Sequence, residues 1–254
     1  MYYSVCVPAV FRGKKIEDVL PAVRRAGFDY YEFWGWQGVD VDACYAAQQR
    51  EGLKLRTLCT KAEPLTNPQK RQEYVDGLKA TAEICKKMGA KVIITQVGSE
   101  QEGMSREAQH VSIVEGLRAC VPVLEEHDLV LMIEPLNTKI NHPGYYMWSS
   151  EEAFQIVDEV GSKHVKVLYD IYHQHITGDL SVEKIVQNLD KIAHFHVAGF
   201  PGRHEPLIDS EIDYPTILRA IKESGYQGSV GLEYMPVNDA EEGLKILHEQ
   251  LLKI

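Results

Sequence analysis

The sequence alternates from end to end between short apolar stretches and longer amphipathic ones. The short stretches are rich in Val, Ile and Tyr, and we predict strands at Tyr3–Val7, Asp29–Phe33, Lys54–Cys59, Val92–Gln96, Val130–Glu134, Val165–Tyr169, Ile192–Val197 and Ser229–Glu233. The predicted helices are Ile16–Ala26, Ala43–Glu51, Pro68–Met88, Arg106–His127, Ser150–Glu159, Val182–Leu189, Tyr214–Ser224 and Ala240–Leu252. Eight such units in 254 residues favour an α/β fold of the (β/α)8 TIM barrel type. An open doubly wound sheet is less suitable, because it usually has about five or six strands.

The same alternation leaves no room for a second domain. No composition change, Pro/Ser-rich stretch or charge run marks a linker, so we expect one barrel domain over residues 1–254. The predicted strands are almost continuously apolar, which is typical of a parallel sheet covered on both faces.

The charge balance limits the partners of the chain. It contains 37 Asp and Glu against 27 Lys and Arg, a net charge of −10. Nucleic-acid binding and attachment to an anionic membrane both depend on basic surfaces, so we expect neither. No apolar run reaches the roughly 18 residues of a membrane span. The first residues show no signal-peptide pattern, and the five cysteines form no Cys-x-x-Cys pair, so we expect reduced thiols and a cytoplasmic location.

Four consecutive predicted strands end in side chains that bind metals. These are Glu134, Asp170, His196 and Glu233. In a barrel the carboxyl ends of the strands meet at the face that carries the active site. One such residue alone is explained equally well as a helix cap or a salt-bridge partner. We interpret four in succession as a site for one divalent metal ion, and this ligand set suits Mn²⁺, Mg²⁺, Co²⁺ or Zn²⁺.

Two further residues follow these strand ends closely. His173 is three residues after Asp170, at the start of the predicted loop, and Arg203 is in the loop after His196. An imidazole and a guanidinium could hold the oxygens of a hydroxycarbonyl substrate, and Arg binds carboxylates with two hydrogen bonds. The structural alternatives are a loop histidine bonded to backbone and a solvated arginine. Glu32 ends the second predicted strand, where it could orient substrate or pair with a Lys or Arg.

The second half of the chain resembles the hydroxypyruvate isomerase family, within the xylose isomerase-like TIM barrels. The resemblance is carried by the segments Ile133-Glu134-Pro135-Leu136-Asn137, Tyr169-Asp170-Ile171-Tyr172-His173, Pro201-Gly202-Arg203-His204-Glu205-Pro206 and Gly231-Leu232-Glu233-Tyr234. It implies that Glu134, Asp170, His196 and Glu233 bind one divalent metal ion. It also implies that Glu134 and Glu233 act as the acid/base pair, and that His173 and Arg203 contact the substrate.

The activity implied by this resemblance is the isomerisation of a small oxo or hydroxy acid, with hydroxypyruvate to tartronate semialdehyde as the named case. One glutamate would remove a proton beside a carbonyl, and the enediolate would be protonated at the neighbouring carbon. The isomerases often have Gln at the position of His196, whereas ketose 3-epimerases of the D-tagatose 3-epimerase type have His. A ketose 3-epimerase is therefore the alternative.

Two more distant alternatives are an endonuclease IV-like phosphodiesterase and a non-catalytic sugar-binding barrel. The endonuclease chemistry depends on several zinc ions and on histidines from early strands, but the first histidine here is His110. For the favoured isomerase we expect a small-molecule substrate and association into a homo-oligomer.

Overall fold

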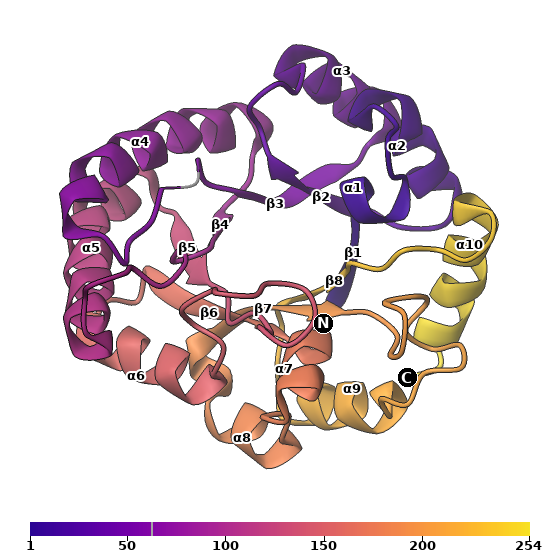
Figure 1. The fold of residues 1–254 in the computed structure, drawn as a ribbon. Coiled ribbons are helices and arrows are strands. Elements are labelled where there is room, and N and C mark those ends of the chain that lie inside the picture. The colour runs from indigo at the N-terminus through magenta and orange to yellow at the C-terminus, as the bar shows by residue number, and fades with distance from the viewer. Residues whose placement is uncertain (62) are drawn as a thin grey trace.

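The computed structural model describes residues 1–61 and 63–254, and its centre is a closed barrel of parallel strands. Each strand pairs with the next, and the last pairs with the first (Figure 1). The strands are β1 (Tyr2–Cys6), β2 (Tyr30–Gly35), β3 (Lys54–Cys59), β4 (Val92–Thr95), β5 (Val130–Ile133), β6 (Val165–Asp170), β7 (Ile192–Val197) and β8 (Ser229–Leu232). The predicted (β/α)8 TIM barrel is confirmed.

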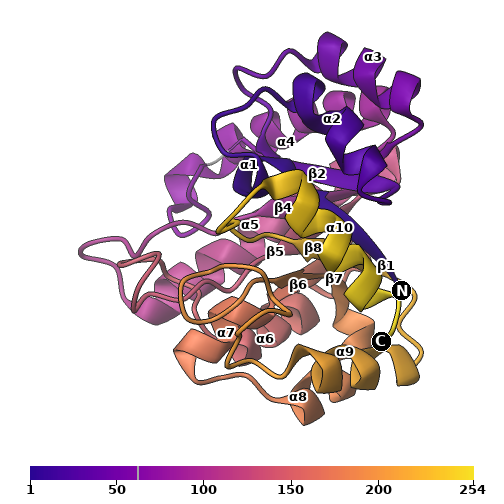
Figure 2. The same cartoon turned by 90° about the vertical axis from the view of Figure 1, so that its right-hand side faces the viewer.

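Helices form a ring outside the strands (Figure 1). They are α1 (Val7–Val10), α2 (Ile16–Arg25), α3 (Val41–Glu51), α4 (Arg71–Met88), α5 (Arg106–His127), α6 (Ser150–Val160), α7 (Ile171–Thr177), α8 (Val182–Gln187), α9 (Tyr214–Glu223) and α10 (Ala240–Leu251), with 3-10 turns η1 (Pro68–Lys70) and η2 (Leu189–Lys191). The last helix, α10, packs beside α2. In Figure 2 both termini lie at one end of the barrel, and long loops project from the other end.

Two short helices, α1 and α7, were not predicted from the sequence. The predicted strand through Val7 ends at Cys6, because Val7 begins α1 and Pro8 lies in its first turn. Proline fits there because the first turn of a helix has no partner for its N–H groups. A helix of one or two turns is too short to show a helical period in the sequence, so the sequence pattern predicts strand or loop at both places.

The interior of the barrel is divided into an apolar and a polar part. Strands β3 to β6 fill one part with buried apolar side chains, which are Cys59, Val92, Ile94, Met132 and Leu168. Strands β1, β2, β7 and β8 place Ser4, Glu32, His194 and Ser229 in the other part, where hydrogen bonds connect them. Buried polar groups must be hydrogen-bonded, and this connected group extends toward the strand ends that carry the predicted ligands.

Two further findings concern the cysteines and the helices. All five cysteines are buried and free, in agreement with the prediction of reduced thiols. Among the residues that the structure describes, no helix combines the length and apolar character needed to cross a membrane.

Candidate active site

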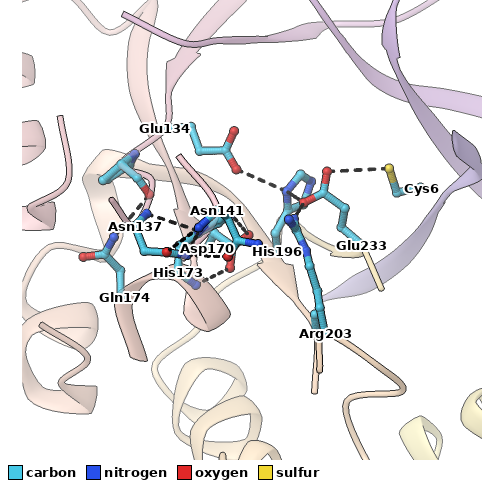
Figure 3. A network of polar contacts seen from close by, with 12 residues as sticks. Cys6, Glu134, Asn137, Asn141, Asp170, His173, Gln174, His196, Arg203 and Glu233 are labelled. Carbon is cyan, nitrogen blue, oxygen red and sulfur yellow. Dashed lines mark hydrogen bonds and ion pairs between the residues drawn. The ribbon is translucent and has the colours of Figure 1, made fainter. Parts of the chain in front are cut away.

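The four predicted metal ligands come together at the carboxyl end of the barrel (Figure 3). Glu134 and Glu233 directly follow β5 and β8, Asp170 is the last residue of β6, and His196 lies in β7. Each offers a ligand atom within 4.8 Å of the others, and all four side chains are buried. Adjacent parallel strands therefore place these residues in one cluster, as the strand-end pattern predicted.

The imidazole of His196 is the centre of this cluster. Its Nδ1 lies 3.5 Å from Oε1 of Glu134 and 3.4 Å from Oε2 of Glu233. Figure 3 shows both carboxylates directed at the ring. Within the described part of the chain, Nδ1 is buried and has no hydrogen-bond partner. A buried nitrogen that faces two carboxylates without a hydrogen bond has the geometry expected of a metal ligand.

The charges of the cluster are unbalanced. Glu134, Asp170 and Glu233 are all buried, and Arg203 is the only Lys or Arg among the described residues that line the adjoining pocket. Burying charges is costly unless opposite charges compensate them. A divalent cation would supply that compensation with the oxygen and nitrogen donors it prefers. The residues present thus fit the predicted divalent metal.

The ionisation of the ligands reflects this crowding. Burial by itself raises the pKa of Glu233, but His196 and Arg203 lower it below its ordinary value by a larger amount. For Asp170 burial is the dominant effect, and the pKa of its carboxyl is raised. Burial alone lowers the pKa of His196, whereas the carboxylates of Glu233 and Glu32 raise it well above the ordinary value. The cluster therefore attracts positive charge, whether a proton or a metal ion.

Asp170 and His173 are tied to each other through α7. One oxygen of Asp170 accepts the backbone N–H of His173 at 2.9 Å, which caps the helix. The other oxygen lies 3.6 Å from Nε2 of His173. The sequence predicted His173 in a loop, but it lies in the first turn of α7. This turn places the ring of His173 beside the carboxylate of Asp170.

The ring of His173 is held in one tautomer. Its Nδ1 accepts the backbone N–H of Asn137 at 3.2 Å, so the ring proton lies on Nε2. Among the described residues, that nitrogen is buried without a hydrogen-bond partner. Burial, together with the charge of Arg203, lowers the pKa of His173 to about 3. His173 therefore presents a neutral N–H donor, which suits the oxygen of a bound substrate better than a solvated loop histidine would.

Arg203 is largely buried and contacts the cluster directly. Its guanidinium donates to Oε2 of Glu233 and lies 5.3 Å from the centre of the Tyr172 ring. Its backbone has a positive φ of 59°, a conformation that few residues other than glycine adopt. The carbonyl of Arg203 accepts the N–H of Met235 at 2.8 Å, which connects the loops after β7 and β8. Arg203 is consequently not a solvated surface residue.

A pocket of about 430 Å³ lies beside the cluster. One wall comes from the second half of the chain, with Glu134, His173, His196, Arg203 and Glu233; Asp170 is buried and does not line the pocket. The opposite wall comes from positions after or near the ends of β2, β3 and β4, namely Trp34, Gln37, Thr60 and Gln96. Trp34 donates to Glu233 at 2.7 Å and Gln96 donates to Glu134 at 3.3 Å.

Several of these pocket residues were not among the predicted site residues. Thr60 and Gln96 directly follow strands, so the rule that found the ligands could have found them too. His142 lies within a long loop, and its ring centre is 5.3 Å from that of His173, which no sequence pattern indicated. Glu32 fits neither alternative given for it: its carboxylate accepts from His194 at 2.9 Å and does not line the pocket.

The barrel and its strand-end ligands define a class of protein, and comparisons give its family. The profile of the xylose isomerase-like TIM barrel family matches residues 20–250, so the chain belongs to that family. It is 36% identical to hydroxypyruvate isomerase of Escherichia coli (strain K12) over 179 residues, which cover 70% of this chain and 68% of that protein. It is 32% identical to the putative hydroxypyruvate isomerase of Homo sapiens over 245 residues, 90% of this chain and 88% of that one.

A solved structure agrees with this placement. The crystal structure described as AP endonuclease, family 2 from Brucella melitensis superposes with a TM-score of 0.91 at 25% identity, covering 98% of this chain and 99% of that one. Within the xylose isomerase-like barrels, the chain belongs to the hydroxypyruvate isomerase family. The resemblance seen in the sequence motifs is confirmed.

Proposed function

We propose that the protein is a metal-dependent isomerase of small oxo or hydroxy acids, with hydroxypyruvate to tartronate semialdehyde as the leading reaction. The observation that carries the proposal is the convergence of Glu134, Asp170, His196 and Glu233 beside a pocket lined by His173 and Arg203. Membership of the hydroxypyruvate isomerase family supports the substrate class. The fold alone would not support a substrate class, because barrels of one fold carry many activities.

In this proposal each residue has a defined role. A divalent metal held by the four ligands would polarise the substrate carbonyl and favour loss of a proton from the adjacent carbon. Glu134 and Glu233 reach the cluster from either side of His196, so one takes that proton and the other returns a proton to the neighbouring carbon. The Nε2–H of His173 donates to a substrate oxygen. Arg203 holds the acid group and also keeps Glu233 ionised.

A substrate panel tests the proposal. The protein is freed of metal, reconstituted with Mn²⁺ or Mg²⁺, and supplied with hydroxypyruvate, four-carbon oxo acids and neutral ketoses. We expect metal-dependent turnover of hydroxypyruvate or another oxo acid, with the product identified by NMR. Turnover of ketoses alone would contradict the substrate class. Activity that survives exhaustive chelation, with no metal found by elemental analysis, would contradict the metal requirement.

A ketose 3-epimerase is the second candidate, on two observations. Position 196 carries the histidine of the ketose epimerases, and a cavity of about 430 Å³ is larger than a three-carbon acid fills. An epimerase returns the proton to the same carbon on the opposite face, so in D₂O it would place deuterium on C3 of a ketose. An isomerase returns it to the adjacent carbon, and the position of the label therefore separates the two.

The endonuclease alternative has little support in the site. That chemistry requires several histidines, some from the early strands, but among the described pocket residues β1 to β4 and the loops after them contribute no histidine. The net charge of −10 also opposes binding to a phosphate backbone.

A further inference from the structure

Glu32 is a buried carboxylate inside the barrel that the proposed reaction does not use. It lies in β2, and its Oε2 accepts from Nε2 of His194 at 2.9 Å and from Oγ of Ser4 at 3.3 Å. Its Oε1 lies 3.2 Å from Nε2 of His196. Oε1 of Glu32 and Nε2 of His196 are both buried, and neither has an aligned hydrogen-bond partner among the described residues. Burying a carboxylate away from solvent costs free energy, so its interactions with these partners must compensate that cost.

A chain of hydrogen bonds fixes the proton positions around Glu32. An ionised carboxylate can only accept, so His194 carries its ring proton on Nε2. In the neutral ring, Nδ1 of His194 then accepts from the hydroxyl of Ser229 at 2.7 Å, and the carbonyl oxygen of Ser229 lies 3.0 Å from the same nitrogen. The Ser229 oxygen accepts a hydrogen bond from Nε of Arg56. The hydroxyl hydrogen of Ser229 is therefore available to be donated to His194. The groups from Arg56 to Glu32 are thus mutually consistent, and each holds the next in place.

At the end of this chain, Glu32 faces the metal ligand. His196 directs Nδ1 at Glu134 and Glu233 and Nε2 at Glu32. A histidine that binds metal through one nitrogen carries a proton on the other, and a carboxylate commonly accepts that proton. We propose that Glu32 is a positioning residue for the metal centre, which accepts the Nε2–H of His196 and so keeps the Nδ1 lone pair directed at the metal. This inference rests on the metal site of the proposed function.

The backbone of β8 is shaped to allow this arrangement. A Cβ atom on Gly231 would lie 2.1 Å from Oε1 of Glu32, 2.6 Å from Cδ2 of His196 and 2.8 Å from Nε2 of His194. Atoms at such distances clash, so any side chain at position 231 would displace the three polar groups. The absence of a side chain there is what lets residues from β2 and β7 meet in the barrel centre.

The test is the affinity for Mn²⁺, measured directly by isothermal titration calorimetry on the metal-free protein. Glu32→Gln keeps the volume of the side chain but presents an N–H to one of the two imidazoles. We expect it to weaken Mn²⁺ binding about 10- to 100-fold, the usual effect of losing a partner of a metal-bound histidine. The matched control is Tyr31→Phe, which removes a buried hydrogen bond to Gln48 from the adjacent residue of the same strand. It should leave the Mn²⁺ affinity within about twofold, because it has no contact with the site.

A second background separates positioning from general damage. In His196→Gln the ligand becomes an amide oxygen, and the imidazole N–H that Glu32 would accept is gone. If Glu32 acts through that N–H, adding Glu32→Gln to this background should change Mn²⁺ affinity by no more than about threefold. A full 10- to 100-fold loss in the double variant would show that Glu32 acts by another route. Thermal unfolding of each metal-free variant verifies that it is folded.

A spectroscopic measurement reports the tautomer itself. With Zn²⁺ bound, ¹⁵N NMR of the wild-type imidazoles should show His196 protonated on Nε2 and ligated through Nδ1. Ligation through Nε2, or an unchanged Mn²⁺ affinity in Glu32→Gln, would overturn the inference and leave the proposed function standing. A wild-type protein that binds neither Mn²⁺ nor Zn²⁺ would overturn both.

Discussion

Gly231 leaves the space in which the side chains of Glu32, His194 and His196 meet. Gly231→Ala should therefore force these groups apart and lower the free energy of unfolding by about 1–3 kcal/mol, as overpacking a filled interior does. It should also weaken Mn²⁺ binding, because the His196 ring is among the atoms displaced. Urea unfolding of the metal-free protein and calorimetry measure the two effects.

The control for this prediction is Gly243→Ala in α10. A Cβ atom there would have no neighbour closer than 3.4 Å, and alanine is favoured over glycine inside a helix by about 1 kcal/mol. This variant should be as stable as the wild type or more so. If Gly231→Ala has the same stability and Mn²⁺ affinity as Gly243→Ala, the barrel centre can accommodate a Cβ atom at position 231, and the prediction is wrong.

In the proposed reaction, Glu134 takes or returns the substrate proton. Glu134→Gln keeps an oxygen donor for the metal but cannot accept a proton, so turnover should fall about 10³-fold. Steady-state kinetics measure the loss, and Mn²⁺ titration establishes whether the metal is still bound. The exposed residue Glu102 serves as control, since Glu102→Gln removes the same charge outside the site. Unchanged turnover in Glu134→Gln would contradict a role of this carboxylate in proton transfer.

At the scale of elements, Asp170 is both a candidate metal ligand and the N-cap of α7. The two roles can be separated, because Asn caps a helix as well as Asp does but carries no charge. Asp170→Asn should leave the stability of the metal-free protein almost unchanged and weaken Mn²⁺ binding. Asp170→Ala should lose both, with a stability cost of about 1 kcal/mol for the missing cap. Equal stability losses in the two variants would contradict the capping role.

The helix α7 also shows where sequence reasoning stops. The strand ends of β5 to β8 could be predicted because each side chain of interest directly follows an apolar run, and parallel strands end at one face. The turn that holds His173 could not, because one or two turns of helix are too short for a periodic pattern. The contact of Glu32 with His194 joins residues 162 positions apart, and only the closed barrel brings them together.

At the scale of the whole molecule, the four candidate metal ligands come from four consecutive strands or the residues directly after them. A bound ion would therefore connect strands β5 to β8. Only the folded state brings these ligands together, so the ion stabilises that state over the unfolded one. At a free Mn²⁺ concentration 100 times the dissociation constant, the gain is about 2.7 kcal/mol. For a chain of this size, that gain corresponds to a rise in Tm of roughly 5–10 °C.

Differential scanning calorimetry measures this rise with Mn²⁺ and after addition of a chelator. Asp170→Ala is the control, since it lacks one ligand and its Tm should respond much less to the same Mn²⁺ concentration. A Tm of the wild-type protein that does not depend on Mn²⁺, Mg²⁺ or Zn²⁺ would contradict the metal site.

The two walls of the pocket have different origins, and this has a practical consequence. The wall from β5 to β8 carries the candidate ligands, the proton-transfer carboxylates and Arg203, whereas the wall from β2 to β4 contributes Trp34, Gln37, Thr60 and Gln96. Protein engineers could therefore treat the chain as a fixed catalytic half joined to an exchangeable recognition half. Trp34 and Gln96 donate hydrogen bonds to Glu233 and Glu134, so libraries would be confined to Gln37 and Thr60. These two positions would sample new substrates while the contacts of the proposed proton-transfer residues stay in place.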